Sequence, residues 1–246
     1  MIGAPFPRLL RAELLKARSA PTLVSMFSLV VAPPLLLVFM TGALDSFDGG
    51  DAAATGAMLA AGATGAVGCA FFGSYLVTKD DYYRAMDRSF LSASPSAVVS
   101  VRVVAAAILG FFFALAGVVV WTIVVAVVLA VRGGDLVLDA DAAAIVSGAV
   151  VAGTLAAVLG CGVGWLVRNY YVAVLVLLVL PPIVGVPMLS RVREVERFLP
   201  VGAVAGLSGA PIDGLLPPPL AGLVLLGWAT LSVAAGWTAV RRRAEG

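Results

Sequence analysis

Residues 103–131 read VVAAAILGFFFALAGVVVWTIVVAVVLAV, a run of 29 residues without a single charge. A helix rises about 1.5 Å per residue, so about 20 apolar residues cross the hydrocarbon core of a bilayer, which is about 30 Å thick. The run is long enough to span a membrane once, with some tilt or interfacial ends, and too short to span it twice. It predicts a transmembrane helix.

Five more charge-free stretches, each at least 22 residues long, occur elsewhere in the chain: 19–44, 52–78, 142–167, 169–190 and 214–240. Six apolar helices in 246 residues would leave no amphipathic shell to cover them in water. The sequence therefore predicts an all-α integral membrane protein with a single transmembrane domain over residues 1–246. Its six spans are expected at about 21–43, 54–78, 102–131, 142–167, 171–190 and 219–240.

The overall composition excludes most other classes of protein. Hydrophobic residues make up 61% and charged residues 12% of the chain, whereas soluble domains average about 45–50% and about 25%. The two cysteines, Cys69 and Cys161, lie inside expected spans and are too few for a disulfide scaffold. A lone cysteine at such a position is usually a small buried apolar residue.

The basic residues fall mainly on one side of the expected spans. Twelve Lys and Arg lie on the side of the termini, while the other side holds four Arg and nine acidic residues. The positive-inside rule then predicts that both termini are cytoplasmic. The bias sits at membrane boundaries, which argues against a nucleic-acid surface. Scarce Lys beside abundant Ala, Val, Gly and Arg is typical of a GC-rich bacterial source, so we expect a bacterial plasma membrane.

Residues 5–18 are expected to form an amphipathic helix in the cytoplasmic interface. The apolar side chains fall on one side at helical spacing, and charged residues gather on the other: Phe6, Leu9, Leu10, Leu14 and Ala17 against Arg8, Arg11, Glu13 and Arg18. Lys16 is part of the same helix. The alternative is a simple basic anchor before the first span. The apolar stretch that follows is longer than the 7–15 residues of a signal peptide, so we expect it to be retained.

The segment 79–97 between the second and third spans mixes both charge signs with aromatic and aliphatic residues. This mixture suits contact with another protein, and a solvated loop is the alternative. We expect Asp80 or Asp81 to begin a short helix there and Pro95 to limit its end. The candidate contact residues of this segment are Asp80, Asp81, Arg84, Asp87 and Arg88.

Prolines and polar residues give further expectations. Pro33-Pro34 should kink the first span, and Pro181-Pro182 should kink or break the fifth. Residues 191–218 are expected to form an outer or re-entrant segment with a short amphipathic helix. Arg102 and Arg168 lie near cytoplasmic span ends and are expected to snorkel to lipid headgroups. Glycines are expected to form packing surfaces: Gly62, Gly65, Gly68, Gly73, Gly160 and Gly164.

Several chemistries lack their residues in this sequence. There is no His, which excludes His-based catalysis and His-ligated metal. Neither Lys16 nor Lys79 lies in a G-x-x-x-x-G-K-[ST] loop, so the chain has no Walker A site for ATP. The interiors of the six spans hold no ionisable Asp, Glu, Lys or Arg, which disfavours ion-coupled transport. A path with so little polarity suits a hydrophobic or amphipathic cargo, and the energy for its transport would have to come from elsewhere.

Three short motifs resemble those of ABC-2 type transporter permeases: Ala12-Glu13-Leu14-Leu15-Lys16 at the basic start, Leu91-Ser92-Ala93-Ser94-Pro95 before the third span, and Gly162 to Asn169 (GVGWLVRN) between the fourth and fifth spans. The resemblance covers essentially the whole chain, and its motifs are loose. Many members carry a Glu in the loop between the second and third spans and a basic residue after the Ser-Pro element. This chain offers Asp80 and Asp81 instead, and Arg102 is the nearest basic match.

The resemblance implies a half-transporter for export. Two six-span subunits would pair, and each would dock a cytoplasmic ABC ATPase subunit, which binds ATP and Mg²⁺, through the N-terminal helix and the segment 79–97. This chain would then hold no cofactor. In that reading Asp80, Asp81, Arg84, Asp87 and Arg88 contact the ATPase, and Arg11, Glu13 and Lys16 belong to the interfacial helix. The second permease copy is either identical or a paralogue, and the cargo is open among drugs, peptides, lipids and antibiotics.

Three other functions stay open at the level of the sequence. A structural or regulatory membrane subunit would show the same spans without a nucleotide-dependent change in access. An intramembrane enzyme would need a polar catalytic cluster, for which Ser74, Tyr75 and Ser147 are the candidates. A secondary transporter would depend on an ion gradient.

Overall fold

The computed structural model describes residues 6–17, 20–41, 50–83, 85–185, 188 and 191–245, and these residues contain no β-strand. The helices before the loop at residues 132–139 are α1 (Phe6–Ala17), α2 (Ala20–Thr41), α3 (Gly50–Ala61), the 3₁₀ segment η1 (Gly62–Gly65), α4 (Ala66–Tyr82), α5 (Met86–Ser92) and α6 (Pro95–Val131). After it come α7 (Ala140–Val167), α8 (Tyr170–Val174), the π-helical segments η2 (Leu175–Val179) and η3 (Pro181–Gly185), α10 (Arg193–Glu196), α11 (Pro200–Leu207) and α12 (Pro218–Glu245).

Among the described residues, five helical stretches are long and apolar enough to cross a membrane: Leu23–Met40, Gly50–Tyr82, Pro95–Val131, Ala140–Val167 and Pro218–Arg243. The all-α membrane class is therefore confirmed, and these stretches coincide with five of the six expected spans. The fifth expected span, 171–190, corresponds in the described residues to a shorter apolar helix, Tyr170–Gly185; residues 186–187 and 189–190 lie outside them. It contains two π-helical segments, one of which begins at Pro181.

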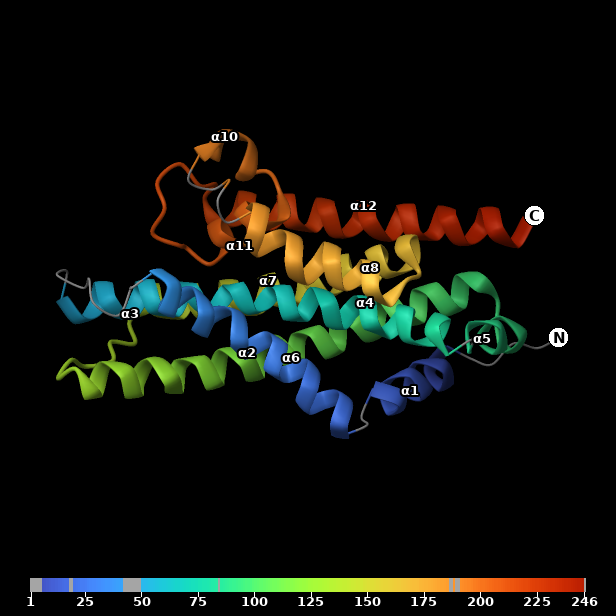
Figure 1. The fold of residues 1–246 in the computed structure, drawn as a ribbon, viewed down its shortest axis with the longest axis horizontal. Coiled ribbons are helices and arrows are strands. Elements are labelled where there is room, and N and C mark those ends of the chain that lie inside the picture. Colours follow the sequence, from blue (N-terminus) through green and yellow to red (C-terminus); the bar gives the residue numbers. More distant parts are fainter. Residues whose placement is uncertain are drawn as a thin grey trace.

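The long helices lie roughly side by side along one axis (Figure 1). The ribbon places α1, α5 and the C-terminal end of α12 at one end of the bundle, here called the α5 end. The opposite end, which carries α3 and α10, is called the α10 end. The segment from α8 to η3 runs from near the α5 end back toward α10, although it is short (Figure 1).

Helix α7 lies at the centre of the bundle, in contact with α4, α6 and α12. Its crossing with α4 is reciprocal: a β-carbon at Gly73 would lie 1.9 Å from the Ala157 carbonyl oxygen, and one at Gly160 would lie 1.7 Å from the Ala70 carbonyl oxygen. Only glycine permits backbones this close. The prediction that span glycines form packing surfaces is confirmed here.

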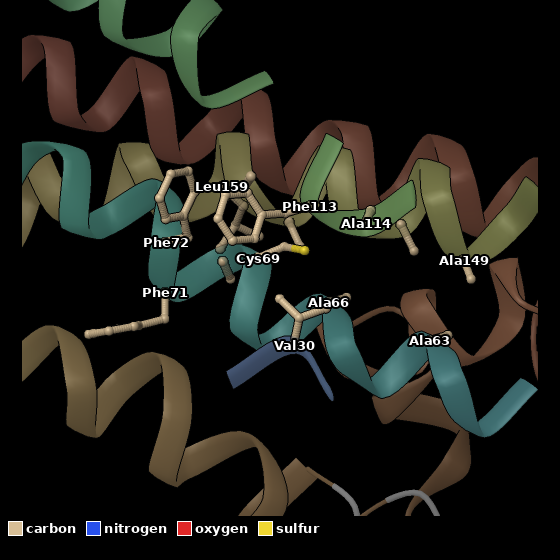
Figure 2. Close-up of a cluster of buried hydrophobic side chains, with 14 of the residues drawn as sticks. Val30, Ala63, Ala66, Cys69, Phe71, Phe72, Phe113, Ala114, Ala149 and Leu159 are labelled. Atoms are coloured by element: carbon tan, nitrogen blue, oxygen red, sulfur yellow. The ribbon is translucent and has the colours of Figure 1, made fainter. Parts of the chain in front are cut away.

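The main core cluster lies where α2, α4, α6 and α7 meet. Phe72 of α4 stacks on Phe113 of α6 with ring centroids 4.4 Å apart, and Figure 2 shows both rings above the buried Cys69. Val30 of α2 lies beside Ala66 in the same view. The core therefore combines a few aromatic rings with many alanines, which lets four helices approach one another.

Helix α2 continues through Pro33-Pro34 from Ala20 to Thr41. A proline has no backbone N–H and its ring crowds the carbonyl four residues earlier, so the carbonyls of Leu29 and Val30 lose their ordinary helical donors. The same two carbonyl oxygens lie against α4 and η1 at Gly68 and Gly65. Glycine Cα–H groups therefore face the two carbonyls that the prolines release, an arrangement suited to weak C–H···O hydrogen bonds.

Helix ends are capped by side chains at several boundaries. The Ser94 hydroxyl accepts a hydrogen bond from the Ala97 amide at 3.3 Å, and Pro95 occupies the first turn of α6. Pro95 thus begins the long helix, and the short helix α5 ends before it. The Asn169 side chain caps α8 by accepting from Tyr171 and Val172. Helices α7 and α8 are joined by a two-residue link, Arg168-Asn169.

Candidate functional site

The most unusual residue of the α5 end is Arg102, which lies in the second turn of α6 and is completely buried. Its guanidinium donates a hydrogen bond through Nη2 to Asp80 Oδ2, at the end of α4. Nη1 contacts the sulfur of Met86 in α5 at 3.3 Å. The guanidinium carbon lies 5.3 Å from the ring centroid of Trp165, in α7. One cation therefore joins four helices.

This arrangement compensates the desolvation of a buried charge. An isolated buried guanidinium is strongly unfavourable, and a close carboxylate together with an aromatic face offsets that penalty. Asp80 is itself largely buried, with 13% of its side chain exposed. Removing either partner would leave an unpaired charge inside the protein, which is the case that destabilises most.

Helix α1 reaches the same cluster through two charged side chains. Glu13 Oε1 accepts a hydrogen bond from Lys16 Nζ at 2.8 Å and lies 3.9 Å from Arg102 Nε. Lys16 Nζ lies 3.6 Å from Asp80 Oδ2. We call Glu13, Lys16, Asp80 and Arg102 the charge cluster. The expectation that Glu13 belongs to the outward polar face of the helix is wrong, because its side chain points toward α6 and is only 13% exposed.

A second ion pair closes the ends of α4 and α7. Arg168 Nε donates to both carboxylate oxygens of Asp81 at 2.9 Å, and Nη2 adds a further bond to Oδ1. Arg168 terminates α7 in the left-handed conformation with φ of 50°. A bidentate pair fixes both the distance and the orientation of the two groups. It holds the end of α4 to the tight turn between α7 and α8.

Two sequence expectations need correction at this point. Arg102 does not snorkel to lipid headgroups, because it is buried and paired with Asp80; Arg168 is partly exposed and pairs with Asp81. Asp80 and Asp81 do not begin a short helix, because α4 continues through them to Tyr82. The partners are 22 and 87 residues apart in sequence, a separation that hydropathy cannot detect.

The remaining candidate contact residues are placed less completely. Arg84 lies outside the described residues. Asp87 and Arg88 belong to α5, and their side chains lie outside the described part of the structure. Arg11 is exposed on α1. Sequence reasoning missed Met86 and Trp165 as partners of Arg102. The available signal was the aromatic side chain of Trp165 close to the expected cytoplasmic end of its span, where it can pack on a cation.

A cleft opens beside the charge cluster at the α5 end. It has a volume of about 350 Å³ and runs between α1, the start of α5 and the first turns of α6. Its walls are mostly apolar, with Glu13 and Lys16 as the charged side chains: Leu9, Ala12, Glu13, Lys16, Ala85, Ser89, Val98 and Val101. The position and lining suit an apolar side chain of another protein, flanked by charge.

Among the described residues of the α10 end, one carboxyl group is buried. Glu196, at the end of α10, is 1% exposed and its Oε2 has no hydrogen-bond partner. Burial raises the pKa of this carboxyl above its ordinary value. Trp228 of α12 donates from Nε1 to the Phe198 carbonyl at 2.8 Å and so anchors the segment to the bundle. The apolar side chains of Val192, Val195 and Phe198 are about half exposed.

Other chemistries find little support in the described residues. No group of three or more Cys, Asp or Glu side chains there could hold a metal ion. Ser74 is buried with an unpartnered hydroxyl, Tyr75 is partly buried, and exposed Ser147 donates to the Ala144 carbonyl of its own helix. Comparisons with protein-family models, curated proteins and solved structures find no match to this chain.

Proposed function

We propose that this chain is the membrane-spanning subunit of an ATP-driven exporter of the ABC-2 type, coupled to a separate cytoplasmic ATPase subunit. The observation that carries the proposal is the charge cluster, which joins α1 and the end of α4 through a fully buried arginine beside an open cleft. A subunit that receives force from outside the membrane needs a direct contact between its docking elements and its spans.

The proposed topology has six spans with both termini in the cytoplasm of a bacterial cell. The path of the chain supports it, because the short segment Tyr170–Gly185 runs in the direction that the fifth span requires (Figure 1). Its two π-helical segments, the second carrying Pro181-Pro182, distinguish it from the five long helices. The excess of Lys and Arg on the side of the termini assigns that side to the cytoplasm.

The proposed partners follow from the surfaces of the chain. The ATPase subunit would supply ATP and Mg²⁺ binding and would dock on α1 and α5, around Arg11, Asp87 and Arg88. A second permease copy, identical or paralogous, would complete the path. The cargo would be hydrophobic or amphipathic, because the long helices offer few polar side chains at membrane depth. Export is the direction that the resemblance to ABC-2 permeases favours.

Affinity purification tests this proposal. The tagged chain is purified in mild detergent from its native membrane, and the eluate is assayed for bound subunits and ATP hydrolysis. We expect an ATPase with a Walker A loop to co-purify, and the double charge reversal Asp87→Arg with Arg88→Asp to weaken its binding several-fold. Asp141→Arg, an exposed acidic residue of α7 near the α10 end, is the matched control. Purification of the intact chain without a nucleotide-binding partner would overturn the proposal.

A further inference from the structure

One nitrogen of Arg102 is left without a hydrogen bond in the buried charge cluster. Nη1 and Nη2 contact Met86 and Asp80, whereas the buried Nε has no partner. Glu13 Oε1 lies 3.9 Å from this Nε, beyond hydrogen-bond distance. A buried charged donor without an acceptor is unfavourable. A small movement of α1 that brought Glu13 within hydrogen-bond distance of Arg102 Nε would therefore lower the free energy.

The carboxylate of Glu13 is used within α1 itself. Its Oε1 accepts from Lys16 at 2.8 Å, and both residues belong to the same helix. This bond does not tie α1 to the bundle. Apolar packing of Leu9 and Ala17 holds α1 to the bundle, and the charged contacts that also do so are longer, at 3.9 Å from Glu13 to Arg102 and 3.6 Å from Lys16 to Asp80. Lys16 and Arg102 therefore compete for one carboxylate.

We propose that α1 is an arm with two positions and that Arg102 is its positioning residue. In the position seen here, Glu13 pairs with Lys16 and Arg102 Nε is unpaired. In the second position, α1 lies closer to α6 by about 1 Å, and Glu13 accepts a hydrogen bond from Arg102 Nε. Lys16 then pairs with Asp80, whose carboxylate already lies close to it.

The cleft provides the room for this movement. It opens between α1, α5 and α6, beside the place where α1 packs on α6, and the walls contributed by Leu9, Ala12, Val98 and Val101 are apolar. Approach of α1 would narrow the cleft and bury more of Leu9 and Ala12, since Val98 and Val101 are already buried. The idea that α1 binds the ATPase and transmits its movement to α4 and α6 rests on the proposed function. The exchange of hydrogen-bond partners by Glu13 does not depend on that function.

A cysteine in the cleft reports which position α1 occupies. Ala85, half-buried in the cleft wall, is replaced by cysteine (Ala85→Cys), and its labelling rate with a water-soluble methanethiosulfonate is measured. The native Cys69 and Cys161 are fully buried and should stay silent. The sample is the purified full chain in lipid nanodiscs, without ATPase. Ala140→Cys, exposed at the start of α7, is the control site.

The variant Lys16→Met gives opposite results for two explanations of the charge cluster. If α1 has two positions, loss of Lys16 removes the competing partner of Glu13, and Glu13 pairs with Arg102. The position with the narrow cleft is then favoured, and labelling of Ala85→Cys slows about threefold or more. If the charge cluster is a fixed tie, loss of Lys16 loosens α1 and labelling becomes faster. A rate that is unchanged or faster overturns the proposal.

The role of Arg102 is tested in the same assay. Arg102→Lys keeps the charge and removes Nε, so it should abolish the slowing caused by Lys16→Met. If Arg102→Lys does not fold, Glu13→Gln serves instead, because it removes the carboxylate charge with little change in shape. Slowing that persists in the folded variant contradicts the proposal. If no ATPase co-purifies, the proposed function fails but the labelling results still support two positions of α1. If the labelling rate does not change, the two-position proposal fails but co-purification still supports the proposed function.

Discussion

The carbonyl oxygen of Leu29 in α2 lies directly over the Cα of Gly68 in α4, so closely that a β-carbon at Gly68 would be 2.2 Å from it. This carbonyl lacks its ordinary helical donor because residue 33 is proline. In a hydrocarbon environment an uncompensated carbonyl is unfavourable. The contact therefore matches a proline on one helix with a glycine on its neighbour.

Replacing Gly68 by alanine should destabilise the protein. The added methyl would meet the Leu29 carbonyl and the Val30 amide nitrogen, which belong to backbone and cannot rotate away. We expect a loss of about 1–3 kcal/mol, as for an overpacked core. The thermal midpoint in detergent, followed by tryptophan fluorescence, measures it.

The matched control is Gly227→Ala in α12, where nothing lies within 4 Å of the added carbon. This variant should melt within a degree or two of the parent protein, or slightly above it, because alanine favours helix. Equal midpoints for the Gly68 and Gly227 variants would show that α2 is not seated on α4 in the manner described.

A double-mutant cycle should expose the buried pair of Arg102 and Asp80. Arg102→Met leaves the Asp80 carboxylate largely buried and without its main partner, which we expect to destabilise by about 3–5 kcal/mol. Asp80→Asn in the same chain removes the orphaned charge and should restore a large part of the loss. Chemical denaturation in mixed micelles gives the coupling energy; additive effects of the two substitutions would argue against the pair.

The left-handed turn at Arg168 predicts an order among three side chains. Asn tolerates positive φ, so Arg168→Asn should keep the turn and lose the ion pair with Asp81, about 1 kcal/mol or less because Arg168 is one-third exposed. Arg168→Val loses the pair and strains the backbone by about 1–2 kcal/mol more. Melting temperatures in the order Arg, Asn, Val agree with this geometry, and a Val variant as stable as Asn does not.

The buried carboxyl of Glu196 predicts a dependence of stability on pH. Its pKa in the folded protein is raised above the ordinary value of 4.5, so the folded state binds the proton more tightly than the unfolded state. Stability is therefore greatest below pH 4.5 for this group and falls as pH rises from 4.5 through the raised pKa. Glu196→Gln should remove that fall and raise the midpoint at pH 7. A fall of the same size in both proteins would assign it to other groups.

Hydropathy predicted most of the long helices because span length and charge exclusion are local properties. The charge-free stretch 103–131 became the apolar part of α6, and 142–167 became α7 almost residue for residue. The segment 171–190 was predicted as an equal span, yet its described part, Tyr170–Gly185, is partly π-helical. The effect of Pro181-Pro182 on this helix depends on how neighbouring helices pack around the prolines, and local composition does not contain that information.

The charge cluster could be predicted only in part. The residue types of Glu13, Lys16 and Asp80 drew attention to α1 and to the end of α4, but Arg102 was expected to face lipid. Its partners Asp80, Met86 and Trp165 come from three other helices, and only the tertiary arrangement brings them together. The pairing of Pro33-Pro34 with Gly65 and Gly68 was equally hidden, since each motif is ordinary in a membrane helix.

The central claim is that an ATPase outside the membrane changes the conformation of this chain. The most direct test is the labelling rate of Val195→Cys, half-exposed in α10 at the end remote from the charge cluster, in the complex with its co-purified ATPase. The account predicts that the rate differs between the nucleotide-free complex and the complex trapped with ATP and vanadate. Identical rates in a complex that hydrolyses ATP would contradict it and favour a structural or regulatory subunit.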